Sequence, residues 1–287
     1  MRFSVDVRII AAAFAGLALL SPSPVTAQTA DAAALPDAPP PNARRLPSRD
    51  FVAIGVGAIS NFPGAADFRV IPFVAGRWDP GYVDARLRGT ALQISVLPTK
   101  PRGTFIEAGP AARLRFGRTR GLDPQVEQVG RVGNAFELGG FVGLYSRGID
   151  HPGDELRVTV QALADVSSVH RGVTGLAEVG YARPIAKRAL VDVSGFAEWL
   201  SRKTTSTYFG VDPVQAARSG LPVFDAGAGA SELGLRLSVT RAFSRRWGVT
   251  VTGSGSRLVG DAADSPIVRR LGSRTQGQFG LAVSYRF

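Results

Sequence analysis

Hydrolytic chemistry in this sequence would need a serine nucleophile and a histidine base that a third group holds in place. The two histidines are His151 and His170, and His170 follows Ser167 and Ser168. The 167–170 spacing matches no nucleophile turn, and the Gly-Ser-Gly-Ser run that ends at Ser256 lacks the strand–turn–helix context of such a nucleophile. We therefore predict no catalytic residue and a hydrogen-bonded turn role for each histidine. A lipid-modifying enzyme is kept as the third functional alternative.

Metal binding is the second chemistry to consider. Asp261, Asp264 and Ser265 are close in sequence and could bind a divalent cation at a lipopolysaccharide surface, or pair with Arg202 or Arg218. Aspartates spaced by three in an alanine-rich loop cap turns more often than they bind metal. Cysteine is absent, so thiolate ligands and disulfides are excluded. We predict no cofactor and no metal.

Charged residues also recur in the middle of segments that alternate apolar and polar side chains. They occupy the face opposite the apolar one and are Glu107, Arg113, Arg115, Glu137, Arg147, Arg157, Asp192, Glu198 and Arg236. In a soluble sandwich these residues would face water, whereas in a membrane barrel they would face each other across a wet lumen. Their mixed signs favour a closed lumen or a narrow pore. A porin-like channel for small solutes or anions is the second functional alternative.

The last dozen residues show which kind of element positions these charges. Phe279, Leu281, Val283, Tyr285 and Phe287 share one face of a period-two pattern that ends on a terminal aromatic residue. Strands of this kind end many proteins of the bacterial outer membrane, where the apolar face meets lipid. An edge strand of a soluble sandwich is the alternative.

The connections between the alternating segments favour a barrel. Counting back from the carboxyl end, long connections (257–274, 201–230, 166–173 and 117–132) alternate with short ones (243–247, 184–188, 147–154 and 97–103). The pattern of 82–96 reverses its faces near Arg88 and Gly89, which predicts a turn or bulge there. We predict an all-β fold, a transmembrane antiparallel β-barrel of twelve strands, with ten as the alternative. The residues predicted to face lipid are Leu235, Leu237, Val249, Val251, Leu281 and Val283.

The amino-terminal region predicts export. Arg2 and Arg8 precede or flank an apolar run over 9–20 that is shorter than the roughly 20 residues of a membrane-spanning helix. We predict a signal peptide over 1–27, a disordered Pro/Ala-rich periplasmic tail over 28–50 and the barrel over 51–287. The net charge of +11 then suits anionic lipopolysaccharide better than nucleic acid, although solvated loop charges explain it equally well.

Three motifs resemble the MipA/OmpV family of outer-membrane proteins. They are the stretches 207–221 and 258–268 and the Ser-Tyr-Arg-Phe ending at Phe287. The resemblance implies a Gram-negative cell outer membrane location and a scaffolding role in peptidoglycan biosynthesis. The family's founding member is described as holding a membrane-bound lytic transglycosylase together with a bifunctional murein synthase. No catalytic residues are assigned in the family, so none are implied here.

Two candidate surfaces follow. Asp212 and Pro213 predict a short helix that Gly220 ends, with Tyr208 and Phe209 pinning it to the barrel mouth. The candidate outer-loop motif comprises Tyr208, Phe209, Gly210, Asp264, Ser265 and Pro266. A murein enzyme would approach from the periplasm and contact the basic short turns and the 28–50 tail. The alternative is that these basic turns only flank the membrane interface. The candidate periplasmic partner surface comprises Lys100, Arg102, Lys187, Arg188, Arg245 and Arg246.

Overall fold

The computed structural model describes residues 50–119 and 123–287. The predicted signal peptide and all of the predicted tail except Asp50 lie outside these residues. Within them, no helix is both long enough and apolar enough to cross a membrane.

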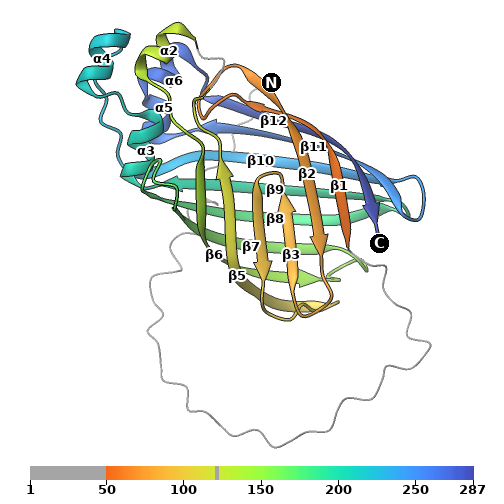
Figure 1. Ribbon diagram of the computed structural model, residues 1–287. Coiled ribbons are helices and arrows are strands. Elements are labelled where there is room, and N and C mark those ends of the chain that lie inside the picture. The colour runs from red at the N-terminus through yellow and green to blue at the C-terminus, as the bar shows by residue number, and fades with distance from the viewer. Residues whose placement is uncertain (1–49, 120–122) are drawn as a thin grey trace, which may run out of the picture. The chain divides into compact units, whose positions relative to one another are not determined.

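Twelve antiparallel strands close into one barrel, which confirms the predicted count and rules out ten (Figure 1). Each strand pairs with its neighbours in sequence, and the first pairs with the last, Phe51 opposite Arg286. The strands are β1 (Phe51–Ser60), β2 (Phe68–Trp78), β3 (Asp84–Arg88), β4 (Ala91–Ser95), β5 (Gly103–Arg115), β6 (Ala135–Arg147), β7 (Glu155–Asp165), β8 (Val173–Ala186), β9 (Ala189–Leu200), β10 (Gly229–Ala242), β11 (Trp247–Leu258) and β12 (Thr275–Arg286).

The alternation seen in the sequence is the alternation of the barrel wall. In β6, Glu137, Phe141 and Tyr145 are buried in the interior, whereas Leu138 and Leu144 are exposed on the outside. The residues predicted to face lipid lie on this outer face, and all but the half-buried Val249 are exposed. The wall therefore presents apolar side chains outward and polar ones inward, as a barrel in a bilayer requires.

Only short turns join the strands at the end that carries Phe51 and Arg286, whereas the longest connections, 116–134, 201–228 and 259–274, join them at the other. Short turns mark the periplasmic end of an outer-membrane barrel, and long loops mark its outer end. The long connections contain five short helices: α2 (Pro124–Val129), α3 (Arg202–Phe209), α4 (Pro213–Ser219), α5 (Gly260–Asp264) and α6 (Pro266–Leu271). They gather at one end of the barrel (Figure 1) and are called the cap below.

The cap has an apolar core of its own. Tyr208 and Phe209 pack with Leu258, Ala262 and Val268 in one buried cluster. The second cluster combines residues from four connections: Phe62, Ala65, Val126, Val129, Val211, Leu221 and Ile267. Helices this short are marginal alone, so their packing on one another and on the strand ends stabilises them.

One hairpin is much shorter than the other strand pairs. β3 and β4 contain five residues each and turn at Gly89 and Thr90, where Gly89 has φ +59°. The turn predicted near Arg88 and Gly89 is therefore confirmed. A left-handed φ favours glycine, which explains why this residue allows so tight a reversal.

Candidate functional site

The lumen holds the largest set of polar side chains, and ion pairs cross it. Near the outer end, Arg113 on β5 donates to Glu137 on β6 at 2.7 Å and to Glu198 on β9 at 2.9 Å. Arg115 reaches the same two carboxylates, at 2.9 and 2.6 Å. Because β5 and β9 are four strands apart in the ring, these contacts span the interior and close it locally.

His170 belongs to this outer cluster. Its Nε2 lies 3.1 Å from Glu137 Oε1, and its Nδ1 lies 3.0 Å from the hydroxyl of Thr204. The Gly172 N–H also donates to Nδ1, which leaves the ring proton on Nε2, facing Glu137.

This carboxylate–histidine–hydroxyl arrangement has the order of a nucleophilic triad. Thr204, however, is 0% exposed, so no substrate reaches its hydroxyl. Ser167 instead donates its hydroxyl proton to the Asp165 carboxylate and accepts a hydrogen bond from the Phe136 N–H. The geometry fits a structural role, in which Thr204 joins α3 to the wall through His170.

A middle cluster is centred on Glu178 of β8. It accepts from Arg157 of β7 and from Arg88 of β3, both at 3.0 Å, and from Arg236 of β10 at 3.1 Å. Arg157 also pairs with Asp192 at 2.7 Å. Arg88 reaches Glu178 from the opposite side of the ring, so this cluster too bridges the lumen.

An inner cluster lies toward the short turns. Arg86 donates to Asp84 at 2.6 Å and to Glu107 at 2.7 Å, and Arg147 donates to Glu155 at 2.7 Å. All five side chains are buried. The nine lumen charges predicted from sequence thus point inward and take part in ion pairs in one of the three clusters.

The rest of the lumen wall is different. On β10, β11 and β12 the inward residues are mostly small and neutral, and hydroxyls pair across strands: Ser238 with Thr252 at 2.7 Å and Thr240 with Thr250 at 2.9 Å. These four side chains are half-buried rather than buried. Solvent therefore reaches this wall more freely than the charged one.

Most of the candidate outer-loop motif is packed inside the cap. Tyr208 and Phe209 are buried, and Ser265 donates to the Phe209 carbonyl at 2.6 Å. Gly210 and Pro266 are buried as well. Burial raises the pKa of Tyr208 to about 12. These residues hold the cap together, and Asp264 alone of the six is exposed.

Two details of this prediction are wrong. The aspartates do not pair with Arg202 or Arg218: Asp264 pairs with Arg274 at 2.9 Å, and Asp261 accepts from Gly227 N at 2.6 Å. Each aspartate therefore contacts a residue that is closer to it in sequence than Arg202 or Arg218.

The predicted pinning of α4 is the second error. Asp212 caps α4 as expected, and Gly220 ends the helix. Tyr208 and Phe209, however, belong to the unpredicted helix α3, and α4 packs on α2 instead. The Gln125 amide donates to the Ser219 carbonyl at 2.7 Å across that contact.

The candidate periplasmic partner surface lies on three short turns. All six of its basic residues are exposed, and none forms an ion pair within 50–119 and 123–287. Two of the turns touch, since Arg188 donates to the Phe243 carbonyl at 3.4 Å. The structure therefore presents a set of unpaired cations at the end that carries Phe51 and Arg286, which is called the basic rim below.

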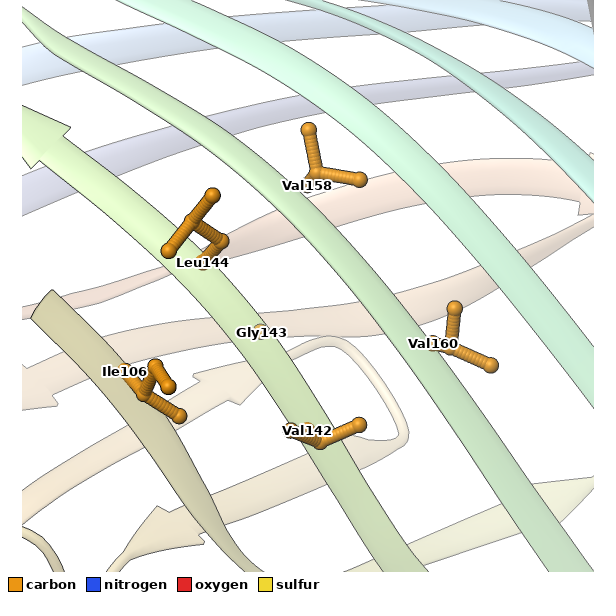
Figure 2. Close-up of a pocket in the computed structure, with 6 residues that line it drawn as sticks. All are labelled: Ile106, Val142, Gly143, Leu144, Val158 and Val160. Carbon is orange, nitrogen blue, oxygen red and sulfur yellow. The ribbon is translucent and has the colours of Figure 1, made fainter. Parts of the chain in front are cut away.

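A shallow apolar depression lies elsewhere, on the outer face of the wall (Figure 2). It is lined by Ile106, Val142, Gly143, Leu144, Val158 and Val160. Its side chains come from the lipid-facing positions of β5, β6 and β7, and it fits the acyl chains that surround a barrel.

Several important residues were missed at the sequence level. Glu178 faces inward opposite Val179, so the alternation of β8 carried the signal for it. Arg86 and Asp84 were hidden by the shortness of the hairpin. Thr204 gave no signal, because it becomes a partner of His170 only when α3 folds over the wall.

A closed barrel with an apolar outside and a polar, charged interior defines the class of this protein: a β-barrel of the Gram-negative outer membrane. The chain belongs to the family described as MltA-interacting protein MipA, whose model matches residues 52–287. The family predicted from the sequence motifs is confirmed.

The solved structures that resemble this chain are outer-membrane barrels of low identity. The NanC porin is 8% identical, covering 82% of this chain and 100% of its own, with a TM-score of 0.45. An outer membrane channel from Pseudomonas putida F1 is 10% identical, with 88% and 100% covered and a TM-score of 0.46. OmpT of Vibrio cholerae is 8% identical, with 83% and 97% covered and a TM-score of 0.38. No curated protein matches the chain.

Proposed function

We propose that this protein is a non-enzymatic scaffold of the outer membrane, which holds a lytic transglycosylase and a bifunctional murein synthase at its periplasmic end. The family description, which names an interaction with MltA, supports the first partner. The murein synthase comes from the family resemblance. Lipids and lipopolysaccharide surround the barrel as partners of its outer face.

The observation that carries this proposal is the basic rim. Lys187 and Arg188 on one turn and Arg245 and Arg246 on the next are exposed and have no acidic partner among the described residues. Unpaired cations on a rigid frame steer an acidic surface toward it, over a screening length of about 8 Å at physiological salt. A murein enzyme with an acidic patch would meet these turns first.

The lumen supports a non-enzymatic role. The hydroxyl that His170 contacts, on Thr204, is buried between strand and cap. Catalysis requires a nucleophile that substrate can approach. The arrangement therefore serves stability rather than acyl transfer.

A small-solute or anion channel is the second candidate, and the half-buried hydroxyl wall of β10–β12 favours it. Against it stand the ion pairs that cross the lumen and the cap over the outer end. Arg113 to Glu198 and Arg88 to Glu178 connect opposite sides of the ring at 2.9 and 3.0 Å. These pairs narrow the lumen between β3 and β9, which makes the scaffold the better-supported function.

The test is crosslinked capture from intact envelopes. In one variant the six residues of the basic rim become glutamine. In a matched control, six exposed basic residues at the outer end become glutamine: Arg171, Lys203, Arg218, Arg257, Arg269 and Arg270. We expect wild type and the control variant to capture a lytic transglycosylase or a murein synthase, and the rim variant to lose it.

Equal capture by both variants would show that the basic rim is not the contact surface. Absence of both enzymes from wild-type crosslinks would refute the scaffold itself. Loss of lipid insertion in the rim variant, read from the membrane fraction, would assign the rim to phospholipid head groups instead.

A further inference from the structure

In the described part of the chain, strands pair with the outer half of β2 along one edge. Its partner β1 follows it from Phe68 to Arg77, but β3 pairs with it only from Ala75 to Trp78. The last backbone contact on that second edge, within the described residues, is Gly89 N–H to the Val74 carbonyl at 2.8 Å. Among residues 50–119 and 123–287, no strand pairs with the backbone of 68–73 on this side.

The short hairpin is the cause. Its tip reaches β5 at Leu114, whose N–H donates to the Thr90 carbonyl at 3.0 Å, and ends there. Figure 1 shows β3 and β4 stopping partway along a wall in which the neighbouring strands continue. Beyond the tip, the described parts of β2 and β5 are joined by side chains, with the Arg69 guanidinium 4.1 Å from the centre of the Phe116 ring.

Pro72 fits an open edge. Backbone polar groups of alternate residues point the same way, so Pro72 shares the direction of Val74 and faces the gap. Proline has no N–H, and within sheets it is confined to edges because it cannot continue a ladder. Pro72 therefore lacks an N–H donor at a position where no neighbouring strand of the described chain would accept its hydrogen bond.

Apolar side chains line both sides of this opening. Outside, Val70 is 76% exposed, the highest value for a large apolar residue in the described chain, and Phe68 is 60% exposed. Inside, Ile71 and Phe73 point into the lumen and are half-buried. Gly280 makes room for the Phe73 ring, which would lie 3.2 Å from a Cβ at that position.

The opening lies in the outer leaflet. The exposed aromatic residues Phe68 and Trp78 mark the two ends of β2 in the way that aromatic girdles mark the bilayer interfaces. Unpaired backbone groups carry a free-energy penalty in hydrocarbon unless they line a wet cavity. The unpaired backbone groups of this edge therefore need hydrogen-bond partners from a wet lumen.

We infer that the wall between the outer half of β2 and the end of β5 is a lateral opening through which a single acyl chain of an outer-leaflet lipid enters the lumen. Acyl chains are what the bilayer presents at this depth, and the apolar path from Val70 past Pro72 to Phe73 suits one. A strand from a second copy is the other possible occupant, and Pro72 opposes it because it interrupts the ladder that such a strand would need.

The test uses the absence of cysteine from the chain. Ile71→Cys, Thr252→Cys and Val251→Cys are each labelled with bimane and folded into vesicles of phosphatidylcholine with brominated acyl chains. Thr252 is the control, because it also faces the lumen and lies in the same register row as Ile71, through the paired residues Gly280 and Gly57. Val251 faces lipid and reports full quenching.

We expect quenching at Ile71 to approach that at Val251 and to exceed that at Thr252 several-fold. Heat-modifiable migration reports folding, and Phe73→Cys, on the same face, replaces Ile71→Cys if the label prevents folding. Quenching at Ile71 no greater than at Thr252 would overturn the inference. Disulfide-linked dimers of Val70→Cys would then assign the open edge to a second copy.

Discussion

The two walls of the lumen carry different kinds of inward side chain. From β3 to β9, long charged side chains such as Arg157 and Glu178 meet in the interior and are buried. From β10 to β12, the inward residues are mostly serine, threonine, glycine and alanine, with Arg236 and Gln276 among the exceptions, and the hydroxyls of Thr240 and Thr250 remain half-buried. One wall fills the lumen, and the other leaves room beside it.

Because of this difference, substitutions in the charged wall should destabilise the barrel more than substitutions in the hydroxyl wall. A buried ion pair contributes little net stability over an apolar pair, but the loss of one partner leaves an uncompensated charge. The charged wall shares each carboxylate among several arginines, as Glu137 does with Arg113 and Arg115. Substitutions there should act on several strands at once, whereas those in the hydroxyl wall should act on one pair.

Glu137→Ala should give the largest effect. It removes a fully buried carboxylate that four side chains contact, and we expect a loss of about 3–5 kcal/mol in the free energy of unfolding. Urea unfolding of the barrel in phospholipid vesicles, followed by tryptophan fluorescence, measures it. Ser238→Ala in the hydroxyl wall is the control and should cost about 1 kcal/mol. Similar losses for both would remove the distinction between the walls.

Arginine substitutions sharpen the contrast between the inside and the outside of the hydroxyl wall. Val251→Arg places a charge among lipid chains and should cost roughly 2–4 kcal/mol. Thr252→Arg points into the half-filled part of the lumen and should cost much less. The same unfolding measurement compares them, and a penalty at Thr252 as large as at Val251 would mean that this side of the lumen has no free space.

A double-mutant cycle on Thr240 and Thr250 should show the smallest effect. Cross-strand hydroxyl pairs contribute roughly 0.2–1 kcal/mol, so the coupling between Thr240→Ala and Thr250→Ala should fall in that range. A coupling of several kcal/mol would indicate that this wall is as tightly networked as the charged one.

The barrel could be predicted from sequence because period two is a local signal. Leu281 and Val283 alternate with Ala282 and Ser284, and the same pattern in each strand fixes which side faces lipid. The break near Gly89 even revealed the short hairpin. Its consequence did not follow from the sequence, because an unpaired stretch of β2 depends on how far β3 and β4 extend beside it.

The site was less predictable for a similar reason. Charged residues could be placed inside the lumen but not matched, since Arg113 and Glu198 are 85 positions apart in the chain and meet across the ring. The cap was harder still. Helix α3 has no side-chain cap hydrogen bond, and its threonines are weak helix formers, so its formation depends on packing against the wall.

Planar-bilayer conductance of the purified protein tests the central claim most directly, namely that ion pairs and the cap close this lumen and leave the basic rim as the functional surface. We predict no steady current in the wild-type protein at physiological salt. A steady, anion-selective current would contradict this account and assign the protein to the channels.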